Sequence, residues 1–235
     1  MNIARIVQLL LATLSGAPAF AGNSVLIWPI DPKVASDEKA AELWLENRGA
    51  STTLMQVRVF SWQQVDGVEQ YQTQQQLLAS PPLVRIEPGQ KQLVRLVKQT
   101  APPPGQEAAY RVLLDEIPTP QPPGENQAGL NFQMRYSVPL FVYGHGLDAA
   151  TAKPLLSWRI IRQQGKAFLE MTNRGAGHAR LSKASLGGRS LSDGLYGYVL
   201  ANSTYRWPLS FPAAANSELV AELNNKSWRS SGSVH

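Results

Sequence analysis

Residues 130–142 read LNFQMRYSVPLFV, and this stretch decides the fold. Every second residue from Leu130 to Val142 is large and apolar, whereas the first four residues between them are polar. A period of two residues is typical of a β-strand that buries one of its faces. At about 3.4 Å per residue the strand would be roughly 40 Å long, well beyond the usual length of about 5–6 residues.

Two interpretations of this long strand stay open. It is either a core strand at a junction between two domains, or a strand whose leading end is an exposed edge offered to a partner. A long apolar edge favours aggregation, and proteins normally suppress it. Its retention here would therefore need a functional reason.

The rest of the chain also has the pattern of short strands separated by turn signals. Before the long strand, we expect strands at residues 25–30, 41–46, 53–62, 83–86, 91–97 and 110–117. After it, we expect strands at residues 153–162, 166–172, 178–186, 196–200, 205–209 and 219–223. No apolar period of 3.6 residues persists over three turns, so the predicted fold class is all-β, built from sandwiches.

Turn residues and composition predict how these strands are divided. Asp66-Gly67, inside a glutamine-rich stretch, is a typical hairpin turn. The composition changes after the sequence YGHG at residues 143–146, which suggests a glycine-flanked hinge. We therefore expect an N-terminal domain over residues 22–145 and a smaller C-terminal domain over residues 146–235. The polar tail, residues 227–235, is expected to be loosely held.

The first residues have the pattern of a secretory signal peptide. Arg5 precedes a short apolar run at residues 6–14, and the triplet Ala19-Phe20-Ala21 matches an A-x-A cleavage site. The run is too short to span a bilayer, which takes about 20 residues. We expect residues 1–21 to be removed and the mature chain to begin at Gly22, with no later segment of transmembrane length.

Composition argues against several classes of function. The chain has no cysteine, and its three histidines, His145, His178 and His235, do not lie at metal-ligand spacing. It has no nucleophile elbow and no glycine-rich nucleotide loop. The neighbouring carboxylates Asp115 and Glu116 should point to opposite faces of one strand. We therefore expect no enzyme activity, no metal and no cofactor.

The charge of the chain says little about nucleic acid. A formal net charge of +5 is a mild excess without a basic run, and the basic residues do not interleave with aromatic ones on one surface. The excess argues weakly for acidic partners, and because basic and aromatic residues do not interleave, we expect no nucleic acid as a partner.

Two segments resemble a known family. Residues 79–96, ASPPLVRIEPGQKQLVRL, are similar to the SPP, EPG and VRL signature of the periplasmic pilus-assembly chaperones, and residues 110–118, YRVLLDEIP, resemble the family's following strand. Residues 130–142 then fall where the family's donor strand lies. RYSVPLFV at 135–142 and LIWPIDP at 26–32 look most like the archaic branch, of Csu or spore-coat-U type.

The resemblance implies two immunoglobulin-like domains set at an angle and a periplasmic chaperone of pilus subunits. Pilus subunits of this pathway have an immunoglobulin fold that lacks its last strand. The chaperone inserts alternate apolar side chains of its donor strand into the open groove, which is a β-strand addition, and then delivers the subunit to an outer-membrane usher. Carried over by position, the inserted residues would be Leu130, Phe132 and Met134, with Tyr136 as a fourth candidate. Residues 25–30 would meet the other edge of the groove.

The sequence departs from the family at the anchor of the subunit's C-terminal carboxylate. Many members use an arginine in the first strand and a lysine late in the donor strand, where this chain has Asp31 and Pro139. Either Arg85, Arg111 or Arg135 supplies the cation, or the alignment slips in this region; an arginine–carboxylate contact is chemically adequate. These arginines are also consistent with ordinary surface residues.

Two further assignments stay open. Pro81 and Pro82 lie in a region that family members present to the usher, or they only form a rigid turn that stops edge pairing. Pairing of the exposed strand with a second copy of the chain is a further alternative for the free protein.

Two functions of other classes remain as rivals. One is an adhesive or structural subunit of a fibre, which should have a single domain. The other is a carbohydrate-binding or hydrolytic β-sandwich, which should expose Trp28, Trp44 and Trp62 together on one face.

Overall fold

The structure is a computed structural model that describes residues 25–118, 133–214 and 216–231. The predicted signal peptide and the candidate residues Leu130 and Phe132 lie outside the described residues. Within the described part the chain forms strands β1 to β17 and no helix. The predicted all-β fold class is confirmed.

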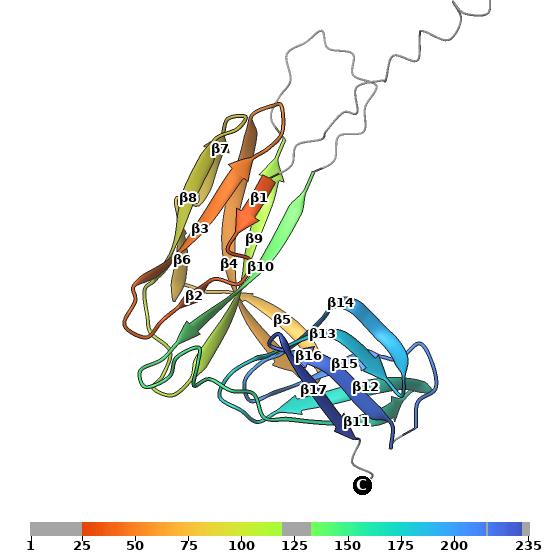
Figure 1. Ribbon diagram of the computed structural model, residues 1–235. Coiled ribbons are helices and arrows are strands. Elements are labelled where there is room, and N and C mark those ends of the chain that lie inside the picture. The colour runs from red at the N-terminus through yellow and green to blue at the C-terminus, as the bar shows by residue number, and fades with distance from the viewer. Residues whose placement is uncertain (1–24, 119–132, 215, 232–235) are drawn as a thin grey trace, which may run out of the picture.

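The first ten strands form two sheets that face each other (Figure 1). The "β1 sheet" has the strand order β1 (Val25–Trp28), β3 (Ala40–Asn47), β8 (Lys91–Lys98) and β6 (Leu77–Ser80). The "β10 sheet" has the order β2 (Lys33–Val34), β10 (Arg135–Tyr143), β9 (Glu107–Ile117), β4 (Thr53–Val65) and β5 (Val68–Thr73), with β7 (Leu83–Ile86) also paired to β4.

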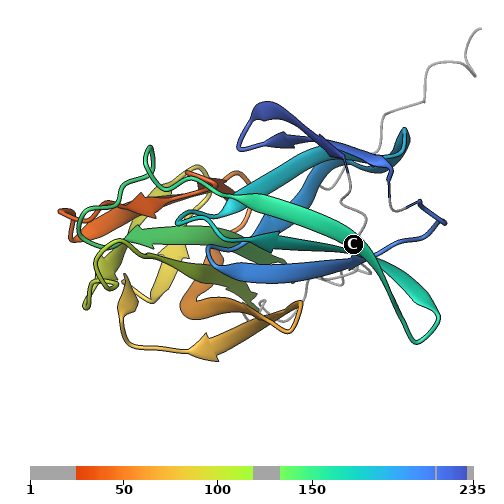
Figure 2. The same cartoon turned by 90° about the horizontal axis from the view of Figure 1, so that it is seen from below.

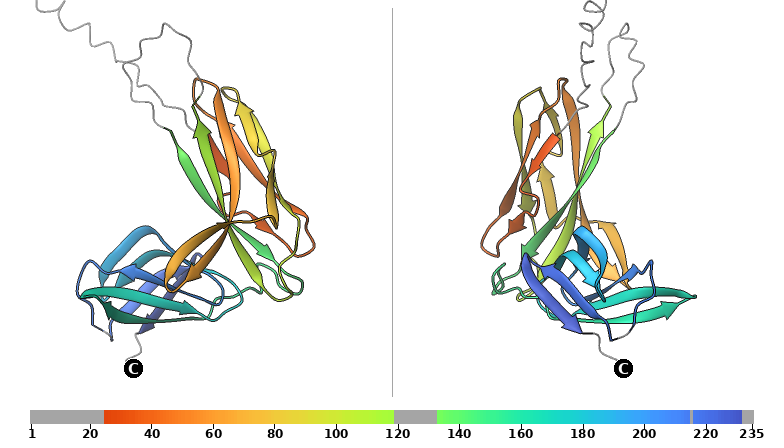
Figure 3. Two further views of the ribbon diagram at one scale, coloured as in Figure 1. Left: turned by 180° about the vertical axis from the view of Figure 1, so that it is seen from behind. Right: turned by 45° about the vertical axis from the view of Figure 1, so that its right-hand side comes forward.

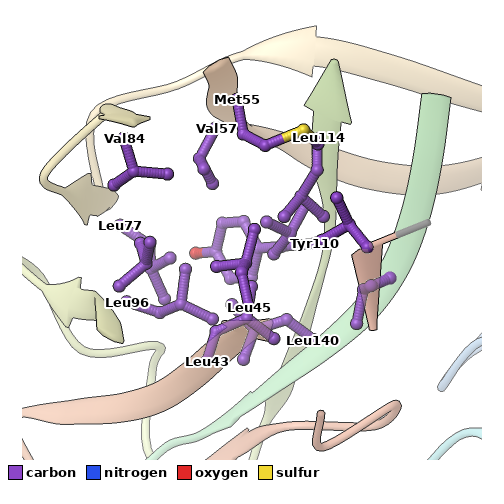
Figure 4. Packing of buried hydrophobic residues seen from close by; sticks show 14 of the residues in the cluster. Leu43, Leu45, Met55, Val57, Leu77, Val84, Leu96, Tyr110, Leu114 and Leu140 are labelled. Atoms are coloured by element: carbon purple, nitrogen blue, oxygen red, sulfur yellow. The ribbon is translucent and has the colours of Figure 1, made fainter. Parts of the chain in front are cut away.

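Alternate residues of both sheets fill the core between them (Figure 4). Leu43 and Leu45 of β3, Leu114 of β9 and Leu140 of β10 are fully buried, at 0% exposure. Because side chains alternate along a strand, the residues between them lie on the outer faces of the two sheets. Burial of each such side chain contributes about 1.5–3 kcal/mol.

The last seven strands form a second sandwich with its own core. One sheet has the order β11 (Leu156–Gln163), β12 (Lys166–Asn173) and β15 (Ser203–Pro208). The other has the order β14 (Arg189–Val199), β13 (Ala179–Leu186), β16 (Glu218–Leu223) and β17 (Lys226–Ser231). Leu169, Met171 and Val199 lie at the centre of this core, at 0% exposure.

Three local expectations need comment. The hairpin turn at Asp66 and Gly67 is confirmed, with φ of 53° and 82°. The prediction of a loosely held tail was wrong as far as Ser231, because β17 pairs with β16 and Trp228 packs against the second core. The long strand begins at Arg135, so the described residues before it, including Met134, are not part of the strand.

The two sandwiches meet at an angle, and a hairpin of the first reaches across to the second (Figures 1 and 3). In the view from below in Figure 2 the two lobes overlap where they meet. The hairpin of β4 and β5 bends towards β15, where the backbone N–H of Arg206 donates to Gly67 O at 3.1 Å. Gln64 of the same hairpin is buried and bonds Tyr198 O and Leu200 N, at 2.8 and 2.9 Å.

An aromatic cluster, the "hinge cluster", fills the contact between the sandwiches. It contains Trp62, Phe141, Tyr143, Leu147, Ala152, Tyr198 and Leu200. Trp62 and Phe141 lie on the outer face of the β10 sheet, so this face is the one that turns towards the second sandwich. We call it the "cleft face".

Candidate functional site

One edge of the β10 sheet is open. Strand β10 pairs with β9 along its whole length, from Arg135 to Tyr143. On its other side β2 pairs only with Phe141 and Val142. Within the described residues no strand covers this second edge from Arg135 to Leu140, so the backbone groups that point outwards there are available to another strand.

Strand β1 lies on the same side of the sandwich as this open edge. It is the edge strand of the β1 sheet, and residues 29–32 link it directly to β2 in the opposite sheet. The first strand segment of the chain therefore switches sheets, and the sandwich is bordered on this side by the free edges of β1 and β10 (Figure 1). A strand added here would have an edge on each side.

The apolar face of β10 is divided between the chain's own core and the exposed end. Val138, Leu140 and Val142 are buried in the first core, at 6% exposure or less, and Tyr136 packs partly against it. Met134, the next residue on this face, is 44% exposed. Of the four candidate residues, Met134 thus faces solvent and Tyr136 is partly covered, whereas Leu130 and Phe132 lie outside the described residues.

The hinge end of β10 is closed and carries a dense set of contacts. The Phe141 ring stacks on the His178 imidazole with 3.4 Å between centroids and 3° between planes. Glu107, whose side chain is 2% exposed, accepts hydrogen bonds from His178 N–H at 2.8 Å and pairs with His178 Nδ1 at 2.9 Å. The Tyr143 hydroxyl also bonds Glu107; burial, followed by this carboxylate, raises the pKa of Tyr143 and keeps it a neutral donor.

The three candidate arginines have different neighbours. Arg85 lies on β7 and pairs with Glu87 at 2.8 Å, at 67% side-chain exposure. Arg135, at the first residue of β10, pairs with Asp115 of β9. Arg111 lies directly opposite Pro139 in the ladder of β9 and β10. Arg85 also points to this outer face of the sheet, because its neighbours Val84 and Ile86 point into the core. Only Arg111 and Arg135, however, lie on the pair of strands at the open edge, whereas Arg85 lies on β7, beyond β4.

Arg111 is the candidate whose charge is least neutralised. Its guanidinium lies 3.7 Å from the Trp62 ring centroid and 5.3 Å from that of Tyr198, and its Nε is buried with no hydrogen-bond partner in the described structure. It also bonds the Tyr71 hydroxyl, whose pKa is raised to about 12 by burial and then by Glu69. A neutral phenol cannot compensate a guanidinium, so Arg111 keeps a positive charge beside the hinge.

A fourth cation, Lys33, was missed by the sequence reasoning. It lies on β2 opposite Phe141, at the point where the open edge of β10 ends. Because Val34 points into the core at 0% exposure, Lys33 lies on the cleft face, where its side chain is 40% exposed and lies 3.4 Å from Asp31. The sequence carried no usable signal for Lys33, because a two-residue strand is too short to recognise by pattern.

Pro81 and Pro82 lie at the other edge of the first sandwich. Both are exposed, between β6 and β7, and Leu78 and Leu83 beside them are 46% and 49% exposed. Pro82 and Leu78 border a cavity of about 450 Å³ whose other walls include Val59 and Phe60 of β4. This surface is apolar and separate from the open edge of β10.

The tryptophans do not form a common surface. Trp28 and Trp44 stack on each other on the outer face of the β1 sheet, with 6.3 Å between centroids and 12° between planes. Trp62 is 2% exposed and lies in the hinge cluster of the other sheet. The arrangement expected of a carbohydrate-binding sandwich is absent from the part of the chain that the structure describes.

Two searches for other kinds of site gave nothing in the described ranges. No group of three or more histidine, cysteine or acidic side chains lies close enough together there to hold a metal ion. In the same ranges no helix has the length and apolar character needed to cross a membrane.

Comparisons with known proteins agree with this architecture. Residues 33–148 match the family model for the N-terminal domain of the PapD pili and flagellar-assembly chaperones. Among solved structures, the chain is similar to the chaperone in the CsuC–CsuE complex of archaic Csu pili from Acinetobacter baumannii, with 36% identity, a TM-score of 0.74, and coverage of 88% of this chain and 96% of that chain. No match was found among curated proteins.

More distant structures share the fold. The E. coli chaperone DraB is 18% identical with a TM-score of 0.62, over 90% of this chain and 97% of that chain. The Pseudomonas aeruginosa chaperone CupB2 is 20% identical with a TM-score of 0.59, over 87% of this chain and 96% of that chain.

Two immunoglobulin-like sandwiches at an angle, with an open strand edge beside the hinge, define a class of non-enzymatic strand-lending chaperones. The chain belongs to the family of pilus-assembly chaperones of the chaperone–usher pathway, whose members are periplasmic. The predicted resemblance to this family is confirmed.

Proposed function

We propose that this chain binds incomplete pilus subunits through the open edge of β10 and the residues that precede it. The observation that carries the proposal is the uncovered edge from Arg135 to Leu140, next to the free edge of β1. A subunit that lacks its last strand would pair its backbone with both edges, and the chaperone would fill the apolar groove. In the complex of CsuC, the relative named above, the partner is the tip adhesion subunit CsuE.

Leu130, Phe132 and Met134 are the side chains proposed to enter the groove. In the sequence they continue the alternation of β10, and Met134, which the structure describes, is 44% exposed. Each buried side chain would contribute about 1.5–3 kcal/mol before the cost of ordering. Tyr136 would contribute less, because it already packs against the first core.

The C-terminal carboxylate of the subunit is proposed to bind at the hinge end of the open edge. Lys33 lies where that edge stops, and Arg111 lies opposite Pro139 without a carboxylate partner among the ion pairs of the described residues. Together they would replace the two cations that many family members use. Arg85, which lies beside β4 and is paired with Glu87, takes no part in this proposal.

The remaining assignments follow the family. Residues 1–21 would direct export to the periplasm, and the boundary between domains would fall near Gly146. Delivery to an outer-membrane usher would use Pro81 and Pro82, which the exposed apolar surface around Leu78 and Leu83 supports. In the absence of a subunit, the open edge would be free to pair with a second copy of the chain.

Co-expression of the tagged chain with a pilus subunit from the same cell tests the proposal. We expect a 1:1 complex that survives gel filtration and is lost when Phe132→Asp is introduced. Leu155→Asp is the control for introducing an aspartate in place of an apolar residue, because Leu155 is 66% exposed and lies in the second sandwich. A folded chain that forms no complex with any exported pilus subunit would overturn the proposal.

A further inference from the structure

Two arginines share one aspartate at the open end of β10. Asp115 accepts hydrogen bonds from Arg58 Nε and Nη2, at 3.2 and 2.6 Å, and from Arg135 Nε. The aspartate side chain is 16% exposed, whereas those of Arg58 and Arg135 are 41% and 64% exposed. One negative charge is thus covered by two positive ones, and the group, which we call the "arginine pair", retains one net positive charge.

The second arginine is not needed to hold the aspartate. Arg58 already makes a two-nitrogen contact with one carboxylate oxygen, whereas Arg135 is the most exposed of the three side chains. Although burial acts in the opposite direction, the hydrogen bonds from Arg135 and Arg58 hold the pKa of Asp115 below its ordinary value. The aspartate is therefore ionised at neutral pH and already accepts three hydrogen bonds, whereas Arg135 gives it only its Nε and keeps further N–H donors.

The position of Arg135 places this net positive charge beside the open edge of β10. Arg135 pairs with Asp115 across β9 on one side, and its other side is the open edge. It lies on the cleft face, with Ser137 and Pro139 following on the same face. A strand that adds to the open edge would lie about 4.7–4.9 Å from β10, so one of its side chains on the cleft face would be next to Arg135.

The other charges on this face leave the region positive. Arg111 and Lys33 follow towards the hinge, where Asp31 lies 3.4 Å from Lys33 and Glu69 bonds the Tyr71 hydroxyl. Each of those carboxylates thus has a partner away from Arg135. Opposite charges directly across a ladder stabilise it and like charges destabilise it. The net positive charge of the arginine pair therefore favours a partner strand with a negative side chain next to Arg135 over one with a positive side chain there.

We propose that the arginine pair selects subunits whose added strand carries an acidic side chain opposite Arg135. This inference rests on the proposed function and names the sequence preference of the same site. The open edge ends where β2 begins, with Lys33 opposite Phe141, so a subunit whose carboxylate lies there must extend from Pro139 towards Arg135. The acidic residue then lies four to six residues before the subunit's C-terminus, on its cleft-facing side.

A charge-swap experiment tests the inference on the pilus subunit that co-purifies with the chain. Its cleft-facing residues four and six positions from the C-terminus are changed in turn to Asp, Asn and Lys. Complex formation is measured by competition against the unmodified subunit. We expect the Asp form to bind roughly five-fold or more tightly than the Lys form at one of the two positions, with a difference that shrinks in high salt.

The reciprocal variant makes the result specific. Arg135→Glu should reverse the order, so that the Lys form binds best, whereas Arg85→Glu, a control of similar exposure, should leave it unchanged. If Asp, Asn and Lys forms bind alike to the unmodified chain, or if Arg135→Glu changes nothing, the inference is wrong although the proposed function stands. If no pilus subunit forms a complex at all, the proposed function itself fails.

Discussion

The two halves of β10 have the same alternation but different neighbours. In the hinge half, β2 covers the edge, and Phe141 and Tyr143 are buried at 1% and 2% exposure against the second sandwich. In the leading half the edge is uncovered, Met134 directly before the strand is 44% exposed, and Asp115 is shared between Arg135 and Arg58. Under the proposed function one strand pattern thus serves two tasks: stability depends on the hinge half, and pairing with the subunit depends on the leading half.

The largest expected effect is a loss of stability caused by a substitution in the hinge half of β10. Phe141→Ala removes a ring that stacks on His178 and packs beside Trp62, so we expect a loss of about 3–5 kcal/mol in the free energy of unfolding. Met134→Ala in the leading half should change it by less than about 0.5 kcal/mol. Chemical denaturation of both variants measures the contrast, and similar losses would contradict the division.

The next largest effect is expected on the affinity for a pilus subunit rather than on stability. Met134→Asp should weaken the complex with a pilus subunit by roughly ten- to a hundred-fold, because an apolar contact of about 1.5–3 kcal/mol is lost. Its stability should stay close to that of the unmodified chain, since Met134 faces solvent. Titration of the purified subunit gives the affinity. An unchanged affinity would mean that the exposed end of the apolar face does not enter the groove.

A third variant concerns the polar contact that holds the hinge half. Glu107→Gln keeps the shape of the side chain but removes the charge that accepts bonds from His178 and Tyr143. We expect a loss of about 1–3 kcal/mol, since hydrogen bonds to a buried charged group are strong. Thermal unfolding measures it. A variant as stable as the unmodified chain would show that the aromatic cluster alone fixes the junction.

The smallest expected effect concerns the ion pairs of the leading half. The pKa of Asp115 is lower in the folded chain than its ordinary value, so its contribution is present above the unfolded pKa, about 3.9, and is lost as the pH falls through the folded pKa. Because its arginine partners are exposed, the contribution at neutral pH should stay below about 1 kcal/mol. Asp115→Asn should show this deficit at pH 7, and the deficit should shrink as the pH falls below about 3.9. A deficit that persists at low pH would assign the effect to packing.

Much of the fold was accessible from the sequence because the alternation is strong in the core strands. The ladder from Arg135 to Val142 and the turn at Asp66 and Gly67 follow from period and turn chemistry alone. Strands β2, β5 and β6 were not predicted, because β2 has only two residues and the other two lie in or beside the glutamine-rich stretch, where apolar residues do not alternate. The tail was misjudged because β17 is polar on its surface and is held by Trp228 and by pairing with β16, which sequence composition does not reveal.

The candidate site was accessible in part. The family resemblance pointed to the donor strand and to the three arginines. Which of these arginines lie near the open edge depends on how the strands pair, and the sequence alone did not predict the pairing. Arg111 and Arg135 lie next to the open edge because β9 and β10 pair as they do, whereas Arg85 lies on β7, beyond β4. Lys33 enters the cleft face only because the chain switches sheets between β1 and β2, a tertiary feature with no local signal.

The hairpin of β4 and β5 has a consequence for anyone who wishes to shorten the protein. Its tip is bound to the second sandwich through Gly67 and Gln64, and its base carries Trp62 of the hinge cluster. A fragment that stops at the glycines near residue 146 would expose that aromatic surface to water and remove the contacts that the hairpin makes with the second sandwich. The covalent order of the two domains is therefore a poor guide to where the chain can be cut, and a self-sufficient N-terminal piece would also require a redesigned hairpin.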